Sequence, residues 1–232
     1  PTASESSTGI LISAPLGELS EPQGSASQGA VSYYRGESLS LESRVVTAPT
    51  LRLVDSAQEK PDSEGYLGTG IWSGMGDYDV SLNGSPAPFT MVSQPVSSEF
   101  AQDSGHLCRV YLLTSEALFS TEETEIRQAA QKRSAVSPCG LYESYGSSMA
   151  SLLFERNEAE YWSVIGIPGF INDAKESNQG AVHLLNWSDQ SPLSEGGGEP
   201  GLILVEEAPE DDAFLGQSLT TLSSSSGDTL VV

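Results

Sequence analysis

Tyr66-Leu67-Gly68-Thr69-Gly70 is the stretch of this sequence from which the fold can be worked out, because its pattern returns twice. The later copies are Tyr145-Gly146-Ser147-Ser148 and Phe214-Leu215-Gly216-Gln217-Ser218. In each copy an aromatic residue or leucine stands directly before a glycine, and small polar residues follow. A pattern that returns at a fixed spacing indicates an internal repeat, and the repeated unit then determines which folds are possible.

Two further landmarks recur in a fixed order around these stretches. A β-rich run ends in a small residue, any residue and a proline, at Pro15, Pro95 and Pro168. A glycine opens an apolar strand at Gly29, Gly105 and Gly180. The prolines are 80 and 73 residues apart (95 − 15 and 168 − 95), and the strand-opening glycines are 76 and 75 apart (105 − 29 and 180 − 105). This constancy indicates an internal repeat of about 75 residues.

Each repeat is expected to contain four short strands. The first follows the aromatic-glycine pair, the second ends at the proline, the third starts at the strand-opening glycine, and a fourth follows, as at residues 50–54 and 201–205. Short strands separated by Gly, Pro, Ser and Asn turns favour antiparallel pairing. Residues 161–167 are apolar on both faces, which is typical of a strand buried between two sheets. The sequence therefore predicts an all-β protein, a sector of a β-propeller made of four-stranded antiparallel blades.

The predicted sector has about three blades and is cut at both ends. We expect a blade that lacks its first strand, two full blades, and the first two strands of another, over residues 1–61, 62–141, 142–209 and 210–232.

Residues 114–138 do not fit the strand pattern. Ser120 or Thr121 suits a helix N-cap, acidic residues fill the first turn, and Lys132 and Arg133 fill the last. We expect a short exposed helix over 120–133, inserted after the third strand of the second blade. Charged helices of this kind usually do no more than face solvent.

Composition excludes several classes of function. The chain has 232 residues, with 32 acidic against 10 basic side chains and a formal net charge of −22. Such a polyanion repels phosphate backbones and anionic lipid, so we expect no nucleic-acid partner.

No stretch approaches the roughly 18 apolar residues of a membrane span. Because His106 and His183 are the two histidines and lie far apart, without HExxH or GxSxG motifs, we expect no catalytic residue.

The order of a Phe/Tyr-Gly pair followed by Gly-Ala-Pro resembles the FG-GAP repeat. That repeat forms the β-propeller of integrin alpha chains and the C-terminal propeller of glycosylphosphatidylinositol (GPI)-specific phospholipase D. Tyr145-Gly146 with Gly166-Ile167-Pro168, and Leu215-Gly216 with Val231-Val232, carry the likeness, which covers nearly the whole chain. The family forms rings of about seven blades. The resemblance therefore implies a piece of a longer, secreted or extracellular protein.

The resemblance implies two functions. In the first, the chain is a non-catalytic propeller segment of a secreted GPI-specific phospholipase D-like protein. It would scaffold a separate zinc hydrolase domain, or position its substrate, and zinc would be held only by that domain. In the second, it is an integrin-alpha-like adhesion propeller that binds a protein or glycan ligand. In both, the nearest partner is the rest of its own propeller.

Calcium is the one cofactor that the family often holds within such repeats, in Asp-x-Asp-x-Asp-Gly loops between the first and second strands. Residues 153–160 and 223–228 lack alternating carboxylates. Asp77 and Asp79, followed by Asn83-Gly84, come closest, but their spacing differs from the motif. An ordinary Asp/Asn/Gly turn is the alternative. The weak calcium motifs favour the phospholipase-like function.

Two possible modifications follow from an extracellular location. Cys108 and Cys139 are the two cysteines, and a disulfide between them would close the inserted loop. Two buried free thiols are the alternative. Asn186-Trp187-Ser188 and Asn83-Gly84-Ser85 are N-glycosylation sequons at predicted turns, although Pro86 follows the second.

Overall fold

The structure is a computed structural model, and almost all of its regular structure is β. It describes residues 9–15, 29–35, 51–54, 66–76, 87–95, 107–114, 124–126, 130, 134–138, 142–155, 159–171, 178–185, 202–206, 213–224 and 227–232. The strands form sheets of two to four strands that are antiparallel except at one pair. The prediction of an all-β protein with antiparallel sheets is confirmed.

The first sheet has the order β1-β2-β3-β7. Its strands are β1 (Gly9–Ala14), β2 (Ala30–Arg35), β3 (Leu51–Val54) and β7 (Thr124–Glu125). The first three pair antiparallel, while β7 comes from much later in the chain and lies parallel to β3.

The second and third sheets are fully antiparallel and share one topology. The second has the order β4 (Ile71–Gly76), β5 (Ala87–Gln94), β6 (Leu107–Thr114) and β8 (Ser134–Pro138). The third has the order β10 (Met149–Glu155), β11 (Ala159–Ile167), β13 (Ala181–Leu185) and β14 (Leu202–Leu204).

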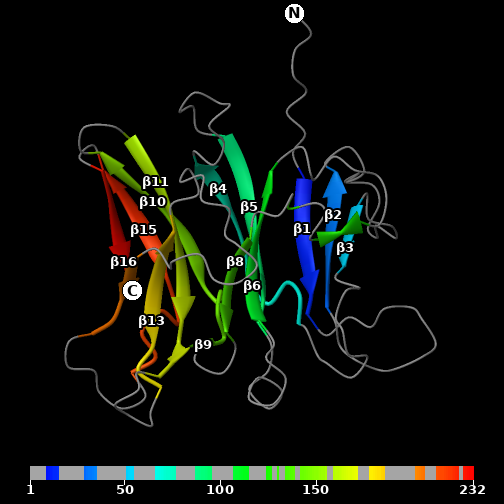
Figure 1. Ribbon diagram of the computed structural model, residues 1–232. Coiled ribbons are helices and arrows are strands. Elements are labelled where there is room, and N and C mark those ends of the chain that lie inside the picture. The colour runs from blue at the N-terminus through cyan, green and yellow to red at the C-terminus, as the bar shows by residue number, and fades with distance from the viewer. Residues whose placement is uncertain are drawn as a thin grey trace, which may run out of the picture.

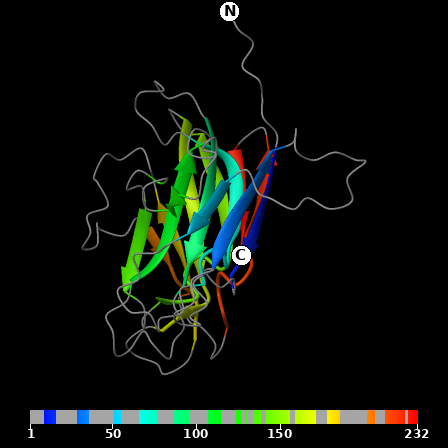
Figure 2. The same cartoon turned by 90° about the vertical axis from the view of Figure 1, so that its right-hand side faces the viewer.

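Two short pairs complete the described strands. One joins β9 (Tyr142–Glu143) to β12 (Gly169–Phe170), and the C-terminal hairpin joins β15 (Thr220–Ser224) to β16 (Gly227–Val231). The three large sheets and the C-terminal hairpin stand side by side in chain order (Figure 1). The first sheet is nearest the viewer when the molecule is seen from the β1 side (Figure 2).

Strand alternation places side chains of one strand into two different cores. On β6, Val110 and Leu112 enter the cluster between the second and third sheets, whereas Tyr111 and Leu113 enter the cluster between the first and second. A third cluster lies between the third sheet and the C-terminal hairpin. Within 161–167, Val164 packs into the third cluster and its neighbour Ile165 into the one between the second and third sheets, as predicted for a strand with two buried faces.

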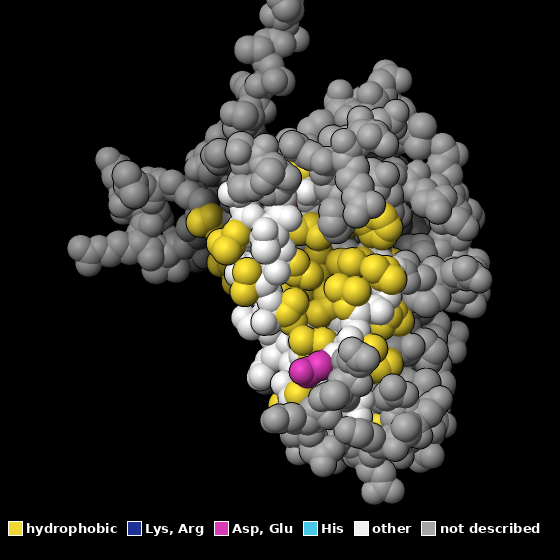
Figure 3. All heavy atoms as spheres, turned by 90° about the vertical axis from the view of Figure 1, so that its left-hand side faces the viewer, with side chains coloured by type: hydrophobic (Ala, Val, Ile, Leu, Met, Phe, Trp, Pro, Cys, Tyr) yellow, Lys and Arg dark blue, Asp and Glu magenta, His cyan; other side chains and the backbone are white. Residues whose placement is uncertain are grey.

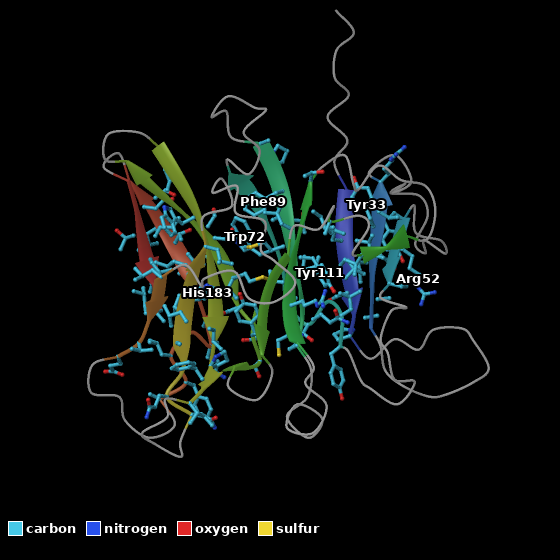
Figure 4. The ribbon with its side chains drawn as sticks, viewed as in Figure 1. Tyr33, Arg52, Trp72, Phe89, Tyr111 and His183 are labelled. Carbon is cyan, nitrogen blue, oxygen red and sulfur yellow. The ribbon has the colours of Figure 1, made fainter. Side chains whose placement is uncertain are left out.

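Aromatic side chains add to these cores. Trp72 of β4 and Phe89 of β5 lie with their ring centroids 5.5 Å apart, at the edge of the cluster between the second and third sheets (Figure 4). Tilted aromatic pairs at this separation contribute about 1 kcal/mol beyond the area they bury.

The exposed helix predicted over 120–133 is wrong for the described part of that segment. Thr124–Glu125 is a strand, Ile126 is helical, and the Ala130 N–H donates to the Ile126 carbonyl at 2.8 Å. Ile126 and Ala130 are buried in the cluster between the first and second sheets. Because residues four apart share one face of a helical turn, these two side chains pack inward together. Ser134–Pro138 then completes the second sheet.

Candidate functional site

The same tight turn occurs three times, at residues 66–69, 144–147 and 214–217, which we name the repeat turns. In each, the N–H of the fourth residue donates to the carbonyl of the first, at 3.1, 3.0 and 3.0 Å respectively. The first and third residues have positive φ in every copy, at Tyr66, Ser144, Phe214, Gly68, Gly146 and Gly216. Positive φ favours glycine, but Tyr66, Ser144 and Phe214 also adopt it, so the glycine at the third position has a further cause in its packing.

Each repeat turn packs against the preceding sheet at one defined point. A Cβ on Gly68 would lie 2.8 Å from the Cβ of Ser13, and one on Gly146 would lie 2.6 Å from the Cβ of Ser93. Gly216 meets Gly166 in the same way, with the Gly166 Cα 3.1 Å from a Cβ placed on Gly216. These are the small residues two positions before Pro15, Pro95 and Pro168. The small residue before each of these prolines thus marks the place against which the next repeat turn packs.

Hydrogen bonds hold the turns in place. The Gly68 N–H donates to the Ser93 carbonyl at 2.7 Å, and the Gly146 N–H donates to the Gly166 carbonyl at 2.9 Å. The Ser148 hydroxyl donates to the Gly216 carbonyl at 2.6 Å, which links the third sheet to the next repeat turn. The first two turns are therefore tied to the second strand of their own repeat, while the glycine of every turn packs on the sheet before.

The strand-opening glycines also contact the repeat turns. Gly29 and Gly180 have φ of 77° and 78°, and they bridge Leu67 and Leu215 of the following repeat turns. The Leu215 N–H donates to the Gln179 carbonyl at 3.0 Å. The repeat-turn glycine, the strand-opening glycine and the small residue two positions before the proline together connect consecutive sheets. We name this contact the repeat joint.

A buried polar pair lies beside the middle repeat turn. The Tyr145 hydroxyl is 2.9 Å from Nδ1 of His183, and both residues are buried. Tyr145 belongs to the repeat turn and His183 to β13 of the third sheet (Figure 4). Burial lowers the pKa of His183 to about 4, so the imidazole is neutral near pH 7. Its Nε2 is buried without a hydrogen-bond partner, so no third group orients the ring as in a catalytic triad.

Other polar groups also pair between strands. The buried Tyr111 hydroxyl donates to Oε1 of the buried Gln94 at 2.8 Å, and the hydroxyls of the exposed Ser73 and the buried Thr90 are 2.8 Å apart. Buried polar groups that satisfy one another stabilise a particular strand pairing. The described polar core therefore serves the packing of the sheets.

A comparison with protein families, curated proteins and solved structures gave no match. The FG-GAP resemblance therefore stays a prediction, and function has to be argued from the geometry.

Most of the site residues predicted from the sequence lie outside the described residues. These are Asp77, Asp79, Asn83, Cys139 and Asn186. Cys108 is buried and takes part in a disulfide. Cys139 directly follows β8, whose Pro138 pairs with Leu107, but its bond to Cys108 stays a prediction.

The described residues contain no group of three or more His, Cys, Asp and Glu placed to hold a metal ion. Within the same part of the chain, no helix has the length and apolar character needed to cross a bilayer.

Asp228 lies in one of the stretches compared above with calcium loops, and the structure gives it a different contact. Its Oδ2 accepts a hydrogen bond from the Leu153 N–H at 2.9 Å, which ties the C-terminal hairpin to β10. We expect Asp228→Ala to lower the free energy of unfolding by about 2 kcal/mol, because the bond joins a backbone N–H to a charged acceptor. Asp228→Asn keeps an acceptor oxygen and should lose less. Urea denaturation of both variants checks this, and equal stability of Asp228→Ala and the wild type would contradict it.

Proposed function

We propose that this chain is a sector of a β-propeller that acts as a non-catalytic scaffold. The observation that carries the proposal is the repeat joint, in which a repeat-turn glycine meets a small residue of the preceding sheet three times, and a described strand-opening glycine bridges the turn in two of them. Four-stranded antiparallel sheets joined by one repeated contact are the construction principle of propeller blades. The second and third sheets each take their four strands from one repeat, and the first sheet adds β7 from the second repeat.

The buried groups support a scaffold rather than an enzyme. Tyr145 and His183 are the described pair that most resembles catalytic chemistry, yet both are buried in the packing of the second and third sheets. A catalytic group has to reach its substrate within hydrogen-bond distance. Their role is therefore to hold the third sheet to its repeat turn.

The parent protein that fits best is a secreted, GPI-specific phospholipase D-like hydrolase whose zinc centre belongs to another domain. The sequence resemblance supports this parentage, and the disulfide at Cys108 suits an oxidising, extracellular compartment. In such a protein the propeller scaffolds the hydrolase domain or positions its substrate, and this chain supplies no catalytic residue.

Two assays on the purified chain test the proposal. We expect no release of a GPI-anchored reporter protein from vesicles above the buffer blank. We also expect the melting temperature in excess Ca²⁺ to match that in EDTA within about 1 °C. Reporter release that a point substitution in this chain abolishes would refute the scaffold function. A calcium-dependent rise of about 4 °C or more, lost in Asp77→Asn, would instead favour the integrin-alpha-like adhesion propeller.

A further inference from the structure

Two residues of the second repeat, and their counterparts in the third, lie side by side where the following repeat turn packs. The first is two positions after the repeat-turn glycine, and the second is the small residue two positions before the proline. In the second repeat these are Gly70 and Ser93, and the Ser93 N–H donates to the Gly70 carbonyl at 2.9 Å. In the third they are Ser148 and Gly166, and the Gly166 N–H donates to the Ser148 carbonyl, also at 2.9 Å. We name each of these two sets a joint pair.

Both joint pairs contain one glycine and one serine, but in opposite order. In each, the carbonyl of the next repeat-turn glycine lies against the glycine of the pair. A Cβ on Gly70 would collide with the Gly146 carbonyl oxygen, and a Cβ on Gly166 would collide with the Gly216 carbonyl oxygen. The residue that receives the following turn is therefore the first of the pair in the second repeat and the second of the pair in the third.

The serine of each pair uses its hydroxyl at the same contact. The Gly70 N–H donates to the Ser93 hydroxyl at 2.7 Å, and the Ser148 hydroxyl donates to the Gly216 carbonyl at 2.6 Å. The space beside each serine is closed to a second side chain. A Cβ on Gly70 would lie 3.0 Å from the Ser93 Oγ, and a Cβ on Gly166 would collide with the Ser148 Oγ.

The order of the pair also changes what the next repeat-turn glycine packs on. A Cβ on Gly146 would lie 2.6 Å from the Cβ of Ser93, a side-chain atom. A Cβ on Gly216 would lie 3.1 Å from the Gly166 Cα and 3.1 Å from the Ile167 backbone N. The turn that follows Gly166 thus lies against the main chain of the sheet before it, whereas the turn that follows Ser93 lies against a side chain.

We infer that the joint pair acts as one unit that determines where the following repeat turn lies. Its glycine receives the carbonyl of that turn, and its serine supplies the hydroxyl. Two serines would leave no room for the carbonyl, and two glycines would remove the hydroxyl. A turn positioned for the order Gly70–Ser93 would collide with a pair in the order Ser148–Gly166. The pair therefore adds specificity to the order in which the repeats stack, and incorrect stacking is a characteristic failure of repeat proteins.

A double-mutant cycle at the second repeat tests the inference. Gly70→Ser alone should lower the folding equilibrium constant by about a hundredfold, because the new Cβ displaces the Gly146 carbonyl. Ser93→Gly alone should lower it by about tenfold, because the hydroxyl is lost and the unfolded chain gains freedom. The double variant again has one serine and one glycine, in the order of the third repeat, and should lie within about tenfold of the wild type. Independent positions would instead multiply the two losses to about a thousandfold, which would overturn the inference.

Ser163→Gly is the matched control for this rescue. Ser163 is a buried serine of β11, three residues before Gly166 and outside the joint pair. Combined with Gly70→Ser, its own loss should multiply the loss of Gly70→Ser, and an equal rescue by Ser163→Gly would count against a specific pair. If Gly70→Ser does not fold, a folded double variant still supports the inference. The reciprocal cycle of Ser148→Gly and Gly166→Ser should give the same pattern, and failure of both double variants to fold overturns the inference.

Urea denaturation followed by circular dichroism gives the folding equilibrium constant of each variant. Hydrophobic side chains gather on the face of the molecule that carries the C-terminal hairpin (Figure 3). Each variant is therefore measured at two protein concentrations, and equal transition midpoints show that aggregation does not affect the comparison. Because this cycle measures stability without a GPI-anchored reporter or calcium, it and the assays of the proposed function fail separately.

Discussion

Gly180→Ala is expected to lower the free energy of unfolding by about 3 to 4 kcal/mol. Gly180 has a φ of 78°, and a Cβ at this position would collide with the backbone N and O of Leu215. Left-handed backbone costs a residue with a Cβ about 1 kcal/mol, and the collision adds the larger part, because main-chain atoms of the next repeat turn have to move. Urea denaturation followed by circular dichroism measures the loss.

Two further substitutions separate the causes. Gly180→Asn tolerates positive φ better than alanine but still carries a Cβ, so it should be nearly as unstable as Gly180→Ala. Gly68→Ala has a similar φ of 87°, but its nearest obstacles are the side-chain atoms Ser13 Cβ and Val31 Cγ2, both at 2.8 Å, and its loss should be smaller. If Gly180→Ala unfolds at the same urea concentration as the wild type, the strand-opening glycine is not part of a joint.

Acid should destabilise the protein through His183. Its pKa is lowered from 6.5 to about 4 because burial penalises the charged imidazolium. Between these two values the unfolded chain binds a proton that the folded chain does not. The stability that His183 contributes is therefore complete above about pH 6.5, falls with decreasing pH, and is lost by about pH 4, for a total of about 3 kcal/mol.

The comparison with His183→Asn isolates this effect. Asparagine places a hydrogen-bonding atom near the position of Nδ1, so it keeps a partner for the Tyr145 hydroxyl and removes the titration. Protonation of carboxylates also changes stability in this range, so the quantity to measure is the difference in unfolding free energy between wild type and variant at each pH. The same substitution at His106, the other histidine, serves as the control. A difference that does not vary between pH 7 and pH 4 would contradict a buried neutral His183.

The features that sequence alone predicted were those with local causes. Gly68, Gly146 and Gly216 are visible in the sequence because positive φ favours glycine, and the close contact with the preceding sheet leaves no room for a Cβ. Pro95 marks a strand end because proline has no N–H to donate to a neighbouring strand. From such marks the strands and their antiparallel pairing follow, and the structure agrees with both.

What sequence could not predict depends on contacts between distant residues. The helix signals of 120–133 agree with the helical conformation of Ile126, but Ile126 and Ala130 are buried between the first and second sheets rather than exposed. Local propensity does not report such burial. The partnership of Tyr145 and His183 spans 38 residues, and the position in the first repeat that matches His183 holds Ser32. No repeated pattern therefore indicates the contact between Tyr145 and His183. The apolar residues Ile126 and Ala130, by contrast, are four residues apart, a spacing that indicates inward packing.

The repeat joint also bears on how such a chain grows over generations. The second and third repeats each carry a turn that fits the repeat before it and a small residue that receives the repeat after it. A gene duplication of one whole period would therefore insert a sheet that already matches both neighbours, and a deletion of one period would close the gap in the same way. We therefore expect any added repeat to carry counterparts of Gly68 and Ser93.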